Sequence, residues 1–255
     1  MSFLCRALVV VLASLALAGA MACGGAEQPA AKPAATPQPT AADVKAHMDD
    51  HFGKVEAVQE AVLRGDLADV IEPATWLAEH QQVAGLPASL QPQIDEMKKA
   101  AKAALAATDI KGAAQATASM ALTCGACHTA ANAKPALAAP AAPAATATGT
   151  ASHMLADQMA VDLMYQGLVG PSDEAWKKGA RQLGQSPLTL KDLPKDPKLT
   201  KEIAALVGVI HTLADKADAA VAPNARATLY GDVIATCAEC HGLHGKVWGP
   251  GLPKK

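Results

Sequence analysis

The chain has 255 residues, of which 51% are hydrophobic, 18% are charged and only 3% are aromatic. This length suits one large domain or two domains of about 100 residues each. The formal net charge of -2 argues against a nucleic-acid partner. The scarcity of aromatic side chains is unusual for a core of this size, and it indicates that another large apolar group completes the core.

The N-terminal segment, residues 1–22, predicts a secretory signal peptide, because a basic residue precedes an apolar run that ends in small residues. Residues 20–23 (Ala-Met-Ala-Cys) resemble a bacterial lipobox, although Ala20 stands where that motif usually has leucine. Ordinary cleavage after Ala20 or Ala22 is the alternative. We favour the lipoprotein, because Cys23 is otherwise an unpaired cysteine in an exported protein. We therefore expect export to the periplasmic face and attachment to a bacterial membrane through a lipid on Cys23.

Two segments rich in proline and alanine divide the rest of the chain. Residues 23–40 contain four prolines and predict an extended tether. Residues 132–150 contain three more and predict a linker between domains. The sequence therefore predicts one domain over residues 41–131 and a second over residues 151–255.

The two predicted domains resemble an internal duplication. Each begins with a His-Met pair, at residues 47–48 and 153–154. From that methionine to the first cysteine of a shared motif there are 76 residues in the first domain and 83 in the second. The difference of seven fits within the proline-rich stretch 184–197, which has no counterpart in the first domain.

Helix caps and apolar periodicity predict four helices in each domain. In the first domain, Thr40 or Asp43 caps a helix that Gly65 ends, and Asp66 and Asp109 cap two others. The expected helices are residues 40–64, 66–82, 89–107 and 109–128 in the first domain, and 152–169, 172–183, 196–220 and 224–241 in the second. No segment alternates with a period of two. We therefore expect an all-α protein of two tandem antiparallel four-helix bundles.

A five-residue pattern, C-x-x-C-H, ends the last helix of each domain. It comprises Cys124, Cys127 and His128 in the first domain and Cys237, Cys240 and His241 in the second. Two cysteines three residues apart lie on one side of a helical turn and can reach the two vinyl groups of one porphyrin. The next histidine supplies an axial nitrogen to the iron. The sequence therefore predicts two covalently attached haem c groups, with His128 and His241 as iron ligands.

Two other interpretations of the cysteine pairs explain less. A thioredoxin-type redox pair follows a strand in a βαβ unit, whereas the residues before Cys124 are alanine-rich and helical. A zinc site built from both pairs requires them to converge on one ion. It also leaves unexplained why a histidine follows each pair at the same position.

The place of the motif in each domain points to one group of cytochromes. Only 15 residues follow Cys240, so residues upstream of the motif must build the second haem site. A four-helix bundle with its motif on the last helix resembles the class II cytochromes c, which comprise cytochrome c′ and cytochrome c-556. The resemblance implies a haem within each bundle, whose sixth coordination position faces the first helix. A methionine there makes a six-coordinate electron carrier, and a non-ligating apolar residue makes a five-coordinate haem that binds small gases.

The first helix of each domain therefore carries the candidate sixth ligand. Met48 and Met154 occupy the same position on an apolar seam, and we expect them to be the distal iron ligands. His51 is the alternative for the first haem, because it lies one turn after Met48 on that seam. Asp157 aligns with His51 in the second domain. A first haem ligated by His51 would be bis-histidine, with a lower potential.

The remaining histidines, tryptophans and arginines are interpreted mainly as structural. His47 and His153 match between the domains but lie one position off the seam. We expect surface or loop positions for three further histidines, His80, His211 and His244, and packing roles for the three tryptophans, Trp76, Trp176 and Trp248. We expect three arginines to lie on solvated helix faces: Arg64, Arg181 and Arg226. The alternative is that these arginines pair with haem propionates.

These features predict an exported electron-transfer protein that exchanges electrons with redox partner proteins and is not an enzyme. The sequence contains no glycine-rich phosphate loop and no evident acid-base or nucleophilic constellation. A five-coordinate protein that binds NO or CO, like cytochrome c′, is the alternative if the two methionines do not ligate iron. A dihaem peroxidase is a third interpretation, but those enzymes resemble the cytochrome fold in which the motif comes early.

Overall fold

The computed structural model describes residues 38–80, 82, 85–140, 149–185 and 196–243. The predicted signal peptide, Cys23 and nearly all of the predicted tether lie outside the described residues, as do His244 and Trp248. The described parts form eight α-helices and one short 3-10 helix, without a strand. The all-α prediction is therefore confirmed.

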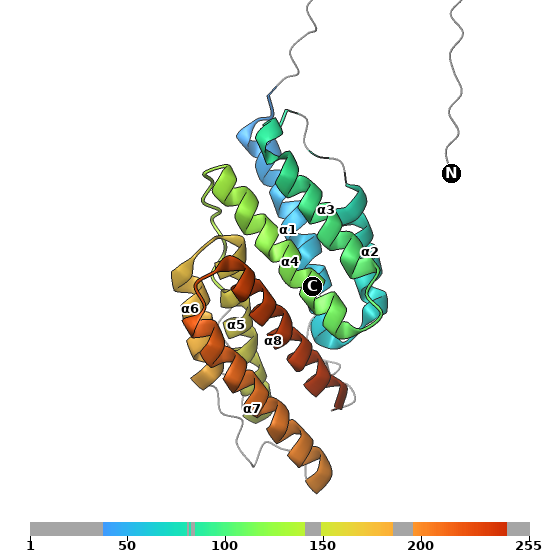
Figure 1. Cartoon of the computed structure of the whole chain (residues 1–255), viewed down its shortest axis with the longest axis vertical. Coiled ribbons are helices and arrows are strands. Elements are labelled where there is room, and N and C mark those ends of the chain that lie inside the picture. Colours follow the sequence, from blue (N-terminus) through green and yellow to red (C-terminus); the bar gives the residue numbers. More distant parts are fainter. Residues whose placement is uncertain (1–37, 81, 83–84, 141–148, 186–195, 244–255) are drawn as a thin grey trace, which may run out of the picture. The chain divides into compact units, whose positions relative to one another are not determined.

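Four helices and the 3-10 turn form the first half of the described chain, which we call the first quartet. They are α1 (Ala41–Arg64), α2 (Leu67–Glu79), η1 (Ala88–Leu90), α3 (Gln91–Leu105) and α4 (Ile110–Ala130). Helix α1 packs on α2 and α4, and α3 packs on the same two helices. The four helices thus close a ring around a shared core (Figure 1).

The second quartet repeats this arrangement. It consists of α5 (Gly149–Val169), α6 (Asp173–Gln185), α7 (Pro197–Ala219) and α8 (Pro223–Leu243). Helices α5 and α7 each pack on both α6 and α8. Trp176 of α6 is fully buried, and its indole Nε1–H donates a hydrogen bond to the Ala217 carbonyl of α7 at 2.7 Å.

The helix ends follow the local chemistry that the sequence predicts. Thr40 and Asp43 form a capping box at the start of α1, and Gly65 ends it in the left-handed conformation at φ 72°. Asp66 and Asp109 accept hydrogen bonds from the first turns of α2 and α4. These caps satisfy backbone groups that a helix end leaves unpaired, so the sequence alone sets these boundaries.

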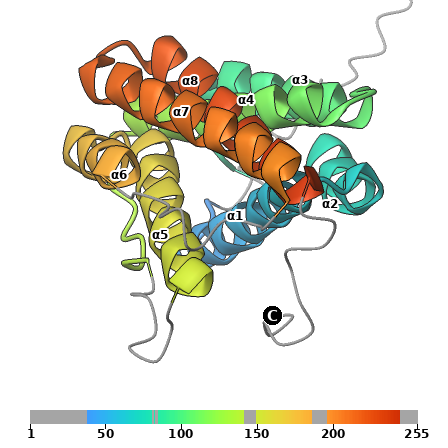
Figure 2. The same cartoon turned by 90° about the horizontal axis from the view of Figure 1, so that it is seen from below.

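The two quartets pack directly on each other. Helix α4 lies along α8, α1 also contacts α8, and α4 also contacts α5 (Figures 1 and 2). At the crossing of α4 and α8, Gln115 donates hydrogen bonds to the Thr228 carbonyl at 3.1 Å and to Asp232 at 2.9 Å. One hydrophobic core runs through both quartets and carries small side chains, mostly alanine and valine.

Candidate functional site

The first C-x-x-C-H motif lies on the last turns of α4. Cys124 and Cys127 are half-buried free thiols. Burial raises the pKa of the Cys124 thiol to about 12 and also raises that of Cys127. Gly125, between them, packs so closely on α5 that an added Cβ would overlap the Leu168 carbonyl. The motif therefore sits where α4 meets the end of α5.

The second motif occupies the equivalent turns of α8. Cys237 and Cys240 are also half-buried free thiols. Burial, with the nearby Asp157 carboxylate as a smaller cause, raises the pKa of Cys237 to about 12 and also raises that of Cys240. Since Asp157 belongs to α5, this motif faces the first helix of its own quartet. In both motifs, therefore, the two cysteine thiols are protonated and lie on one turn of a helix.

The two motif histidines make matching hydrogen bonds across the contact between the quartets. Nδ1 of His128 lies 2.7 Å from the Val169 carbonyl oxygen, and Nδ1 of His241 lies 2.7 Å from the Leu63 carbonyl oxygen. A carbonyl oxygen can only accept, so each Nδ1 carries the proton and donates it. Leu63 and Val169 are separated by 106 residues, as are the two His-Met pairs, so the carbonyls are equivalent. Each histidine is thus oriented by the other quartet.

This orientation is the one that a metal-ligating histidine requires. A hydrogen bond from one ring nitrogen to a carbonyl fixes the tautomer and makes the other nitrogen the ligand atom. In both motifs that atom is Nε2. The chemistry of the donor set, two thiols and one oriented imidazole on consecutive turns, fits covalent haem c in each motif.

The candidate sixth ligands do not lie deepest on their helices. Met48 and Met154 are both half-buried. On α1 the buried face passes instead through His47, which is 6% exposed, and His51, which is 9% exposed. These two histidines continue the helical spacing of Val55, Val58 and Val62. The sequence interpretation placed His47 one position off this face, and the structure corrects it.

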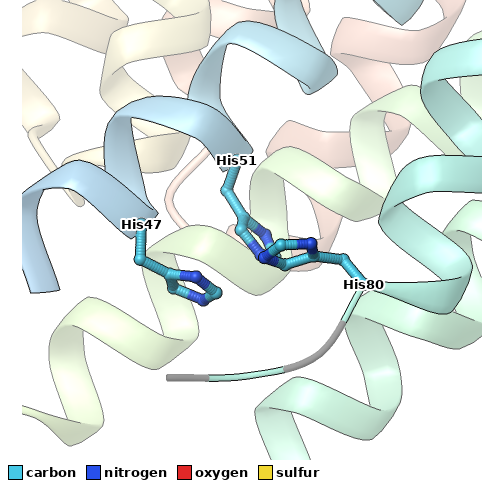
Figure 3. A group of neighbouring side chains, drawn as sticks. All are labelled: His47, His51 and His80. Atoms are coloured by element: carbon cyan, nitrogen blue, oxygen red, sulfur yellow. The ribbon is translucent and has the colours of Figure 1, made fainter. Parts of the chain in front are cut away.

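Three histidines from two helices converge in the first quartet (Figure 3). His47 and His51 are one turn apart on α1, and His80 follows the last residue of α2. Their candidate ligand nitrogens all lie within 4.8 Å of one another. The ring centroids of His47 and His51 are 4.4 Å apart, and His80 stacks on Trp76 at 3.8 Å.

His80 was expected at an ordinary surface or loop position, and the structure places it in this cluster. Helix α2 ends at Glu79 rather than near Gln82, because His80 leaves the helical conformation with ψ 135°. Its ring then lies between Trp76 and the two histidines of α1. The signal in the sequence was the pair of histidines four residues apart on α1, a spacing that places both on one face of a helix.

Burial keeps His51 uncharged near neutral pH. Desolvation, with smaller contributions from the neighbouring His47 and His80, lowers the pKa of His51 from 6.5 to about 4. Desolvation and His47 also lower the pKa of His80. A neutral imidazole is the form that binds metal ions.

The second quartet carries a different pair at the equivalent place. His153 aligns with His47, and Asp157 aligns with His51. The His153 ring and the Asp157 carboxylate lie 3.1 Å apart, and both side chains are largely buried. The second quartet therefore has a histidine at the position of His47 and a carboxylate at the position of His51.

The three arginines considered as propionate partners all have carboxylate partners. Arg64 pairs with Asp69 at 2.7 Å, and Arg181 pairs with Asp218 at 2.9 Å. Arg226 is 5% exposed rather than on a solvated face. It donates to Asp173 at 2.6 Å and to the Ala220 carbonyl at 2.9 Å. Arg226 thus joins the start of α6 to the loop before α8.

The only two tyrosines of the chain, Tyr165 and Tyr230, lie in the core close to the motif cysteines. Tyr165 of α5 contacts Phe52 of α1 across the two quartets, with ring centroids 5.6 Å apart. Burial raises the pKa of both tyrosines well above 10, and neither hydroxyl has a hydrogen-bond partner among the described residues.

We expect the tyrosines to ionise only when the protein unfolds. The unfolded chain loses phenolic protons near pH 10, whereas the folded chain keeps them, so the free energy of unfolding falls as the pH rises above about 10. Ultraviolet tyrosinate absorbance should appear in one cooperative step, together with loss of helical circular dichroism. The urea-unfolded chain is the control and should titrate near pH 10. A tyrosinate step near pH 10 in the folded chain would contradict the buried positions.

Among the described residues, no helix combines the length and apolar character needed to cross a membrane. In the comparisons with known proteins, no family model, curated protein or solved structure matches the chain. A functional assignment therefore depends on the geometry of the two motifs and their surroundings.

Proposed function

We propose that the chain is an exported dihaem c-type cytochrome that transfers electrons. In this proposal each quartet is an antiparallel four-helix bundle of the class II type. One haem is attached to Cys124 and Cys127, with His128 as its axial ligand. The other is attached to Cys237 and Cys240, with His241 as its axial ligand.

The matched hydrogen bonds of the two motif histidines carry this proposal. A histidine that served only to pack α4 or α8 would not need the same ring nitrogen on an equivalent carbonyl in both halves. Here His128 and His241 each donate from Nδ1 to a carbonyl at 2.7 Å. That arrangement supports a shared role in which Nε2 faces an iron.

The chain's own residues would supply attachment, orientation and a dry surrounding. The haem iron, when bound, supplies the reversible one-electron chemistry. The cysteines would fix the porphyrin to the last turns of α4 and α8. The carbonyls of Leu63 and Val169 would hold the axial rings and raise their basicity, which favours the oxidised iron. The alanine- and valine-rich core would supply much of the apolar surrounding of the porphyrins.

Direct packing of the quartets supports a fixed relation between the two haems. Helices α4 and α8, which carry the motifs, lie against each other. The described helices all belong to one unit of the chain, Thr36–Lys255. Electrons would then pass between haems held in one compact unit, rather than between separate domains joined by a linker.

The sixth ligands in this proposal are Met48 and Met154, on the first helix of each bundle. Both are half-buried, and a thioether on a flexible side chain can turn inward toward an iron. His51 is the rival for the first haem, since it is buried on the same helix. The predicted lipid on Cys23 and the redox partner proteins belong to the proposal as well.

The test is an absorption spectrum of the haem-matured protein, oxidised and reduced, with and without carbon monoxide. Two His/Met haems should give a weak sulfur-to-iron band near the red end of the oxidised spectrum and no response to carbon monoxide. High-spin bands that shift with carbon monoxide would instead identify an open sixth position and a gas-binding protein. Absence of a c-type haem spectrum would contradict both.

A further inference from the structure

We infer that His47, His51 and His80 form a binding site for a divalent transition-metal ion, separate from the haem attachment sites. The site would take an ion of the zinc and copper class, because neutral imidazole is a ligand that these ions prefer. It goes beyond the proposed electron-transfer function and does not depend on it.

The spacing of the three rings is close to that of a coordinated ion. Their candidate ligand nitrogens lie within 4.8 Å of one another. Around a tetrahedral zinc, nitrogens at 2.0–2.1 Å from the ion are about 3.3 Å apart. Side-chain rotations that move each nitrogen by about 1 Å would close the difference. His47 and His51 share one face of α1, so α1 supplies two ligands and the end of α2 supplies the third.

The polar atoms around the cluster are arranged as a metal site needs them. Nε2 of His51 is buried and has no hydrogen-bond partner among the described residues. A buried nitrogen without a partner is costly, and a metal ion would satisfy it. Nε2 of His47 lies 3.2 Å from Oε1 of Gln82, which leaves Nδ1 as its ligand atom and gives it the outer partner that metal-binding histidines usually have.

Aromatic packing holds the rings in place. Trp76 stacks on His80 at 3.8 Å and meets His51 edge-on at 5.1 Å. Preorganised ligands lose less conformational entropy when the ion binds. Among the described residues of the second quartet no such cluster forms, and Asp157, which aligns with His51, pairs with His153. In the described chain the cluster is therefore found in the first quartet.

Convergence of three imidazoles favours a non-haem ion over the iron of the first haem. A haem iron already ligated by His128 has one remaining axial position, so it can use only one of the three rings. An ion such as zinc takes three protein nitrogens and keeps a fourth position for water. Lys98 is half-buried near the cluster, and its positive charge contributes to lowering the pKa of both His51 and His80. The Asp50 carboxylate opposes this effect at His80 by raising its pKa.

The experiment measures zinc binding by the full haem-matured chain, purified without a polyhistidine tag. Equilibrium dialysis with Zn²⁺ gives stoichiometry and affinity, and zinc K-edge X-ray absorption counts imidazole ligands separately from the haem iron. The variants are His51→Ala and His80→Ala; His80 is half-exposed, so its replacement disturbs the core less. His153→Ala is the matched control in the second quartet. Circular dichroism checks that each variant folds.

We expect one tightly bound zinc ion per chain, with three imidazoles at 2.0–2.1 Å. Each cluster variant should bind zinc at least ~10-fold more weakly, and the control should bind it as the original chain does. Two results would overturn the inference. One is an original chain that binds no zinc, or zinc binding that stays unchanged in both cluster variants. The other is that the original chain takes up no zinc and that the His51→Ala replacement changes the spectrum of the first haem. That result would assign His51 to the haem iron. A chain that binds zinc but carries no haem would contradict only the proposed function.

Discussion

Replacing both cysteines of one motif by alanine is expected to remove half of the haem from the protein. The variant Cys237→Ala with Cys240→Ala should keep one haem per chain, on α4. The variant Cys124→Ala with Cys127→Ala should keep the other, on α8. The reason is that each porphyrin would be attached through its own pair of thiols, so loss of one pair leaves the other attachment intact. Haem per protein is measured by the pyridine haemochrome spectrum, and intact mass gives the number of attached porphyrins.

The two double variants serve as controls for each other, and the variant with all four replacements should carry no covalent haem. If thioether attachment is the role of these thiols, single replacements within a pair should leave a haem joined by one bond. Unchanged haem content in either double variant would contradict the proposed attachment site. The free thiols of the unmatured chain should also react with alkylating reagents slowly at neutral pH, since burial raises their pKa.

Gly167→Ala in α5 is expected to cause a large loss of stability. An added Cβ would lie 2.6 Å from the backbone nitrogen of Trp176 and 2.7 Å from its Cα. Backbone atoms of α6 cannot move aside as a flexible side chain can, so α5 and α6 must separate. We expect the free energy of unfolding to fall by about 3 kcal/mol, at the upper end of what overpacking costs.

The matched control is Gly208→Ala in α7, where nothing lies within 4 Å of an added Cβ. This change should raise the free energy of unfolding by up to about 1 kcal/mol, because alanine favours a helix interior more than glycine does. Urea unfolding followed by circular dichroism measures both variants. Equal effects of the two substitutions would show that α5 and α6 do not approach each other as closely as described.

Local chemistry in the sequence accounts for the helices. The side chains of Thr40, Asp66, Asp109 and Asp196 each bond the first turn of the helix that follows, and Gly65 adopts a conformation that other residues avoid. These interactions connect residues a few positions apart, so a reader of the sequence can place them. The C-x-x-C-H motif is local in the same sense, and its position at the end of a helix was predictable.

Interactions between distant residues could not be read in this way. His128 is oriented by Val169, and His241 by Leu63, which is 178 residues away. The approach of His80 to His47 and His51 depends on where α2 ends and how it packs on α1. The burial of Arg226 depends on the meeting of α6 and α8. Each of these contacts forms only when the helices are packed, and apolar periodicity does not specify which buried faces meet.

The sequence by itself therefore determined an all-α chain, the capped starts of several helices and the two motifs, because helix caps, helical periodicity and a five-residue pattern involve neighbours along the chain. Only the tertiary structure decided that the quartets pack through α4 and α8, that each motif histidine is held by the opposite quartet, and that three histidines converge beside Trp76. Those features depend on how small side chains pack between helices that are far apart in sequence. Many different pairings of helix faces would bury a similar apolar area, so the sequence pattern does not select one of them.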